Sequence, residues 1–295
     1  MNCRIFLTKV LLFNVLKSIS LTAAFAFITS FVSFAQDPNY HIYLCIGQSN
    51  MEGNARFEAE DTVGINPRFQ LLQAVNCPDL KREINKWYTA VPPLTRCNTG
   101  LTPVDYFGRT LVANLPKEVK VGVVVVAVGG CKIELFDRDK QDAYIATAPE
   151  WMKGMLKQYD NSPYGRLVEL AKEAQQKGVV KGILLHQGES NTGDSLWVSK
   201  VKKIYNNLLL DLHLNAKDVP LLAGEVVNAA QKGVCASMNG IIAKLPQTIP
   251  NAYVISSVGC SAAPDNLHFN AAGYRELGKR YAIQMLTILK RTSKK

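Results

Sequence analysis

Ser49 is the residue of this sequence best placed to act as a nucleophile. It lies in segment 47–51 (GQSNM), directly after the apolar run 42–46 (IYLCI), which is typical of a buried strand. Such a strand holds the serine rigidly, and the amides of the turn that follows point at whatever the hydroxyl attacks. Serine and asparagine after a strand are also ordinary helix N-cap and turn residues, so this segment alone leaves both interpretations open.

A serine nucleophile needs a general base, and histidine is the usual one because its pKa lies near neutrality. The chain has four histidines. His41 precedes the first strand, at the wrong end of a sheet, and His213 ends a predicted helix without a partner motif. His186 closes a strand and is expected to be a buried structural residue beneath the site. His268 remains, and Asp265, three residues before it, can orient its ring and stabilise the imidazolium.

Attack on a carbonyl carbon builds a negative oxygen, which requires donors that are already in place. The backbone amides of Ser49 and Gly130 can supply two, because glycine permits close approach of the backbone. The side-chain amide of Gln187 is expected to supply a third. Taken singly, Gly129-Gly130 also reads as a plain turn and Gln187 as a polar strand end. Together these groups complete the set that acyl transfer requires.

Three further polar residues are expected to support this site from behind. Glu189 could compete with Asp265 as the partner of the histidine, although we expect it to organise the site through hydrogen bonds. His186 and Asn50 are expected beside it. The spacings of histidine and cysteine do not resemble a zinc site, so the sequence predicts no metal.

The candidate site residues must be positioned by a sheet, and the pattern of the chain indicates which kind. Short β-branched runs alternate with longer helical patterns, which is typical of a parallel sheet with helices on both faces. Ligands of such sheets bind at the carboxyl ends of the strands. The expected strands are 42–46, 121–128, 182–186, 220–226 and 252–257, and the expected helices are 106–115, 163–177, 195–212 and 271–289.

Two longer segments, 57–103 and 133–162, interrupt this rhythm and are expected to be irregular. Both are rich in aromatic residues, and such insertions usually shape a binding site. The alternative is that the insertions only cover the surface and that their aromatic rings stabilise them through local packing. The aromatic residues concerned are Trp87, Tyr88, Phe136, Tyr144 and Trp151.

The first 35 residues read as a secretory signal peptide. Arg4, Lys9 and Lys17 precede an acid-free apolar stretch, 21–34, and small residues favour cleavage after Ala35. An uncleaved membrane anchor is the alternative, but the apolar core is shorter than the roughly 20 residues that a spanning helix needs. We therefore expect a secreted or periplasmic protein with no stable membrane insertion, and a single domain from 36 to 295.

Charge and cysteine content agree with that expectation. Without residues 1–35 the formal charge falls from +10 to +7, and no nucleic-acid motif is present, so we expect no nucleic-acid partner.

Six cysteines remain without residues 1–35. Cys77 and Cys97 flank a loop rich in Pro, Asn and Thr and are the best candidates for a disulfide, followed by Cys235 and Cys260. Cys45 lies within a strand and reads as a small buried hydrophobe.

The candidate residues carry a family resemblance. Segments 47–51 (GQSNM), 128–130 (VGG), 186–189 (HQGE) and 265–268 (DNLH) resemble the four blocks of the SGNH hydrolase superfamily. The forms of the first and third blocks are similar to the carbohydrate esterase family 6 and sialate O-acetylesterase branch. Two departures stand out: Gln187 replaces the usual asparagine as oxyanion donor, and Cys131 stands where relatives often carry Thr or Ser.

This resemblance implies a flavodoxin-like three-layer α/β/α sandwich with a five-stranded parallel sheet, and an esterase without a cofactor. It implies Ser49 as nucleophile, Asp265 and His268 as its acid and base, and an acetylated carbohydrate as substrate. Acetylated xylan is the expected substrate, and O-acetylated sialic acid is the alternative. A carbohydrate-binding protein with an idle triad is the alternative from another functional class.

Overall fold

The two central strands of the sheet are apolar on both faces. β1 (Asp37–Gly47) and β4 (Lys120–Ala127) pair in parallel, and successive valines of β4 point into two different hydrophobic cores. Val124 and Val126 lie in one core and Val123 and Val125 in the other. A continuous apolar run is what a parallel strand covered on both sides requires. The structure, a computed structural model, describes residues 36–292.

The sheet has seven strands in the order β3-β2-β4-β1-β5-β6-β7. The five strands that the sequence predicts are all present and parallel, but the expected five-stranded sheet is wrong, because two strands lie inside the segment expected to be irregular. β2 pairs in parallel with β4, and β3 pairs antiparallel with β2, so the sheet is mixed. The further strands are β2 (Phe69–Leu72), β3 (Trp87–Thr89), β5 (Gly178–His186), β6 (Leu221–Gly224) and β7 (Ala252–Ile255).

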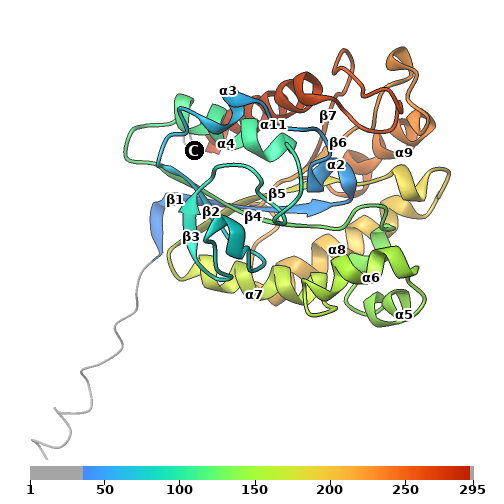
Figure 1. Ribbon diagram of the computed structural model, residues 1–295, viewed down its shortest axis with the longest axis horizontal. Coiled ribbons are helices and arrows are strands. Elements are labelled where there is room, and N and C mark those ends of the chain that lie inside the picture. Colours follow the sequence, from blue (N-terminus) through green and yellow to red (C-terminus); the bar gives the residue numbers. More distant parts are fainter. Residues whose placement is uncertain (1–35, 293–295) are drawn as a thin grey trace, which may run out of the picture. The chain divides into compact units, whose positions relative to one another are not determined.

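Helices cover both faces of the sheet and complete three layers (Figure 1). On one face α4 (Pro103–Asn114) packs against α11 (Ala271–Thr292), and their apolar residues share one core with Tyr43 and Cys45 of β1. On the other face α7 (Pro163–Gln175) and α8 (Trp197–Asp211) share the second core with Ile42 and Leu44. Alternate residues of β1 thus face opposite helix layers, as the two-residue period of a strand dictates.

The second insertion is also more regular than expected. It contains η2 (Ile133–Phe136), α5 (Gln141–Ala146) and α6 (Glu150–Lys157), which lie on the side of α7 and α8 (Figure 1). Short helices also occupy the loops, namely α2 (Ser49–Glu52), α3 (Ala59–Thr62), η1 (Pro78–Leu80), η3 (Glu189–Asn191), η4 (Ala229–Gln231), η5 (Ala236–Met238), α9 (Asn239–Ile242) and α10 (Leu245–Thr248).

One of the two expected disulfides is present. Cys77 and Cys97 are bonded, with their Cα atoms 5.3 Å apart, and they close the first insertion onto itself. Cys235 and Cys260 are both free, so the second expected pairing is wrong. Cys45 is buried in the core, as expected.

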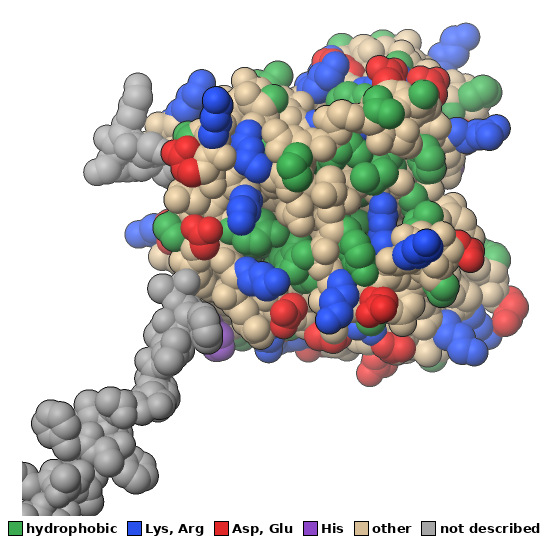
Figure 2. Space-filling view, turned by 60° about the vertical axis from the view of Figure 1, so that its left-hand side comes forward, with side chains coloured by type: hydrophobic (Ala, Val, Ile, Leu, Met, Phe, Trp, Pro, Cys, Tyr) green, Lys and Arg blue, Asp and Glu red, His purple; other side chains and the backbone are tan. Residues whose placement is uncertain are grey.

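Other expectations concern the surface and the termini. The expected signal peptide lies outside the described residues and stays a prediction. Within residues 36–292 no helix is long and apolar enough to cross a bilayer. On the face shown in Figure 2, basic side chains are scattered among acidic and apolar ones.

Candidate active site

Ser49 lies at the first turn after the central strand β1. β1 ends at Gly47, where a Cβ atom would lie 2.1 Å from the carbonyl oxygen of His186, so only glycine lets the chain turn this close to β5. The helix α2 then begins at Ser49, which is 9% exposed. The serine therefore stands at the carboxyl edge of the sheet, where ligands of open α/β sheets bind.

Ser49, His268 and Asp265 form a continuous hydrogen-bonded chain. The Oγ atom of Ser49 lies 2.9 Å from Nε2 of His268, and Nδ1 of His268 lies 2.7 Å from Oδ2 of Asp265. Serine and histidine are 219 residues apart in the sequence. The loop between β7 and α11 carries the two partners to the end of β1, so the fold brings together the three residues that the sequence predicts.

The loop also orients Asp265 toward the ring. Its Oδ1 atom accepts hydrogen bonds of 3.0 Å from the amides of Leu267 and His268, which leaves Oδ2 for the imidazole. Partial burial by itself raises the pKa of Asp265, but the hydrogen bonds from the His268 amide, the His268 ring and the Leu267 amide lower it overall. A carboxylate held ionised in this position favours the tautomer that leaves Nε2 free to take a proton from Ser49.

Two backbone amides beside the serine are free to stabilise an anion. Within the described part of the chain, the amides of Ser49 and Gly130 have no protein acceptor. Gly130 adopts φ +71°, a left-handed conformation that favours glycine. A Cβ atom there would also lie 2.6 Å from the Trp151 ring. Ser49 and Gly130 both line the pocket, and their role as oxyanion donors stays a prediction.

Gln187 does not take the position expected of an oxyanion donor. Its Nε2 atom lies 2.7 Å from Oδ1 of Asn191, 3.0 Å from Oε1 of Gln48 and 3.3 Å from the carbonyl oxygen of Cys131. Its Oε1 atom accepts a hydrogen bond from the Trp197 indole, which can only donate, so the orientation of the amide is determined. Both of its N–H groups therefore have protein acceptors, and the side chain is absent from the pocket lining.

Asn50 and Glu189 lie beside the hydrogen-bonded chain of Ser49, His268 and Asp265. Asn50 donates to Glu189 and to the carbonyl of Leu267, and its Oδ1 atom accepts from the Phe269 amide and the Tyr274 hydroxyl. Glu189 therefore contacts Asn50, while Asp265 occupies Nδ1 of His268. Burial raises the pKa of Glu189, although the hydrogen bond from Asn50 opposes that effect.

His186 is fully buried, as expected. Its Nδ1 atom lies 3.4 Å from the hydroxyl of Tyr281, and burial lowers the pKa of the ring to about 3. Cys131 is likewise buried, with Sγ 3.8 Å from the carbonyl of Gly47.

Sequence reasoning missed a buried ion pair at the site. Glu52, in the last position of α2, pairs with Arg96, and Oε1 of Glu52 also accepts a 3.1 Å hydrogen bond from the amide of Gly129. The pair thereby anchors the turn that presents Gly130. Glu52 lies three residues after Ser49, a spacing that could have indicated it, whereas nothing local in the sequence points to Arg96.

A pocket of about 390 Å³ opens in front of Ser49 and His268. Trp151 of α6 forms part of its wall and is 61% exposed. Of the five aromatic residues that the sequence singles out in the insertions, Trp151 alone is among the lining residues. The lining consists of Gln48, Ser49, Glu52, Asn54, Gly129, Gly130, Trp151, Met155, Glu189, Ser190, Leu267 and His268. Among residues 36–292 no His, Cys, Asp or Glu side chains are grouped as metal ligands would be.

Three solved structures share this fold at low sequence identity. A protein from Arabidopsis thaliana has 21% identity and a TM-score of 0.65, over 85% of this chain and 99% of that one. NanS has 16% identity and a TM-score of 0.59, over 86% of this chain and 99% of that one. A carbohydrate acetylesterase from Xanthomonas citri has 18% identity and a TM-score of 0.58, over 82% of this chain but 55% of that longer one.

A family profile matches nearly the whole described part of the chain. It spans residues 39–287 and describes the family as carbohydrate esterase, sialic acid-specific acetylesterase. The match includes all four segments that supply the residues of the site. This chain therefore belongs to the family of sialic acid-specific acetylesterases, a family of carbohydrate esterases.

Proposed function

We propose that this protein is a serine esterase that removes O-acetyl groups from a sugar, with Ser49 as the nucleophile. The observation that carries the proposal is the chain of contacts from Ser49 through His268 to Asp265, at 2.9 Å and 2.7 Å, in an open pocket. These distances lie within the range at which a base can take the proton of a serine hydroxyl.

The mechanism has two halves that use the same residues. His268 takes the Ser49 proton as Oγ attacks the acetyl carbonyl carbon, and the amides of Ser49 and Gly130 donate to the oxygen that becomes negative. The imidazolium then protonates the sugar oxygen, which leaves as an alcohol, and the acetyl group stays on Ser49. Water, deprotonated by His268, then attacks the carbonyl carbon of this acetyl-enzyme. The bond to Oγ breaks, acetate leaves, and the imidazolium returns its proton to Oγ of Ser49.

For the sugar itself we propose an O-acetylated sialic acid, because the description of the family supports it. Acetylated xylan, which the sequence favoured through the resemblance, has no separate support from any residue of the pocket. It serves as the comparison substrate.

The test is acetate release from O-acetylated sialic acid, acetylated xylan and p-nitrophenyl acetate, by the wild type and by Ser49→Ala. We expect the wild type to be active on the sialic acid and on the small ester, and Ser49→Ala to lose at least about 10³-fold in kcat. Ser199→Ala is the matched control, because Ser199 is exposed on α8 and, among residues 36–292, its hydroxyl bonds only to the Leu196 carbonyl. Its activity should equal that of the wild type.

Each alternative has its own outcome. Release from xylan in preference to sialic acid would overturn the proposed substrate but not the mechanism. Full activity of Ser49→Ala would overturn the nucleophile. A wild type that binds sugar yet releases acetate from none of the three esters would show a carbohydrate-binding protein with an idle triad.

A further inference from the structure

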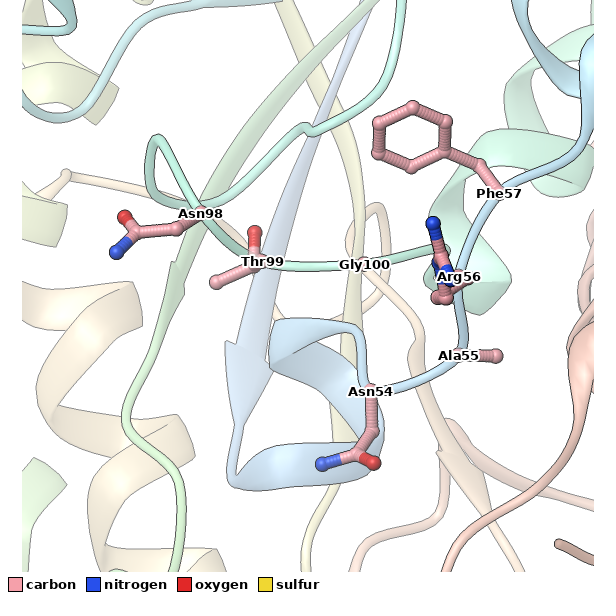
Figure 3. A pocket seen from close by; sticks show the side chains of 7 residues that line it. All are labelled: Asn54, Ala55, Arg56, Phe57, Asn98, Thr99 and Gly100. Carbon is pink, nitrogen blue, oxygen red and sulfur yellow. The ribbon is translucent and has the colours of Figure 1, made fainter.

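A second pocket adjoins the one in front of Ser49. It has a volume of about 280 Å³ and lies between segments 54–57 and 98–100 (Figure 3). Asn54 lines both pockets, so the two adjoin at this residue. Asn54 is exposed, so a substrate whose acetyl group lies at Ser49 would reach the second pocket by extending past this side chain.

The walls of this second pocket are held in place by the backbone. The amide of Gly100 donates to the carbonyl of Gly53 at 2.8 Å, and the amide of Leu101 donates to that of Ala55 at 2.7 Å. A Cβ atom on Gly100 would lie 2.1 Å from the Ala55 carbonyl oxygen, so glycine permits this approach. The Cys77–Cys97 disulfide anchors the chain immediately before Asn98. A site formed before binding loses little ordering entropy when the ligand enters.

The polar side chains of this pocket have unused hydrogen-bonding capacity. Within residues 36–292, the side chains of Arg56, Asn54 and Asn98 have no hydrogen-bond or ion-pair partner. By contrast, two arginines of the first insertion are engaged: Arg96 pairs with Glu52, and Arg82 donates to backbone carbonyls. Arg56 is exposed at the pocket and is the only cationic side chain in its lining.

The chemistry of Arg56 indicates which ligand group it suits. A guanidinium is planar and presents paired N–H donors that match the two oxygens of a carboxylate. The two asparagine amides can donate to and accept from hydroxyl groups. Phe57, which also lines the pocket and is 38% exposed, offers an apolar surface to the C–H face of a sugar ring. This combination fits a sugar that carries one negative charge.

We propose that the pocket lined by Arg56 binds the carboxylate of an acidic sugar and thereby selects acidic over neutral acetylated sugars. This inference rests on the proposed function, since it assigns to the acetylesterase the part of the substrate that the Ser49 pocket does not contact. Arg56 pairs with the carboxylate, Asn54 and Asn98 bind hydroxyl groups, and Phe57 packs against the ring.

The test compares an O-acetylated sialic acid with its carboxamide, which keeps the shape of the sugar and removes its charge. Acetate release measures kcat/KM for each compound. In the wild type we expect the acid to be favoured by about 10- to 100-fold, mostly through KM, as expected for a charge-assisted hydrogen bond in a partly exposed site. In Arg56→Gln the ratio should fall close to one, and in Arg56→Lys it should lie between.

Arg291→Gln is the matched control. It removes the same charge from an exposed position about 30 Å along α11 from the end that follows His268, and its ratio should equal that of the wild type. A wild-type ratio near one, or a ratio unchanged in Arg56→Gln, would overturn the inference while leaving the esterase intact. Absence of acetate release from both sugars and from p-nitrophenyl acetate would instead overturn the proposed function.

Discussion

The hydrogen bonds of Gln187 predict that this residue stabilises the fold and is not an oxyanion donor. In Gln187→Ala the buried indole N–H of Trp197 loses its acceptor, which costs about 1–3 kcal/mol of unfolding free energy. The loss of the Gln187 amide costs less at Asn191 and Gln48, because their side-chain oxygens keep hydrogen bonds from the amides of Ile133 and Ser190, respectively. The cavity left by the shortened side chain adds roughly 1 kcal/mol. The total is about 2–4 kcal/mol.

A double-mutant cycle tests this magnitude by urea unfolding. Gln187→Met keeps most of the side-chain volume but leaves the Trp197 indole N–H without its acceptor, and Trp197→Phe removes the indole itself. If the orphaned N–H causes the loss, the double variant should be more stable than the sum of the two single losses predicts, by at least about 1 kcal/mol. Strictly additive losses would contradict the importance of this hydrogen bond.

Activity distinguishes the structural role from a catalytic one. Loss of an oxyanion donor costs on the order of 10² to 10³ in kcat. We expect folded Gln187→Met to lose less than about tenfold, because Gln187 supports the pocket through Gln48 and Cys131 and does not line it. A variant with wild-type unfolding free energy and a kcat lower by 10² or more would refute this reasoning and restore the role expected from the sequence.

Two further predictions concern the pocket wall and the buried histidine. Trp151→Ala should lower kcat/KM about tenfold for an acetylated sugar relative to p-nitrophenyl acetate, because an exposed ring at the pocket can pack on a sugar but not on a small ester; equal losses on both would contradict this. Because burial lowers the pKa of His186 to about 3, only the unfolded state gains its proton as pH falls below about 6.5, so stability decreases toward acid pH. Between pH 6 and 4, the unfolding free energy of His186→Gln, measured with urea, should fall less steeply with decreasing pH than that of the wild type, by about 1 kcal/mol per pH unit. Parallel pH profiles of the two proteins would refute this.

Local patterns in the sequence were sufficient to predict five of the parallel strands, namely β1, β4, β5, β6 and β7. The continuous apolar runs of β1 and β4 require burial on both faces. Their length and composition therefore identify them as buried strands even before their neighbours in the sheet are known. β2 and β3 are four and three residues long, too short for their periodicity to exceed that of a loop. Their pairing with β4 and with each other could be seen only in the folded chain.

Residue types and their order along the strands likewise determined the candidate nucleophile, base and acid. Four histidines are few enough for elimination, and Asp265 and His268 are neighbours in one turn, so their contact is local. The partners of Gln187, the Glu52–Arg96 pair and the pocket around Arg56 are not local. An amide that can donate toward a substrate can equally donate to Asn191, and the tertiary structure decides between them, because a buried donor bonds to the acceptor that the fold places within reach.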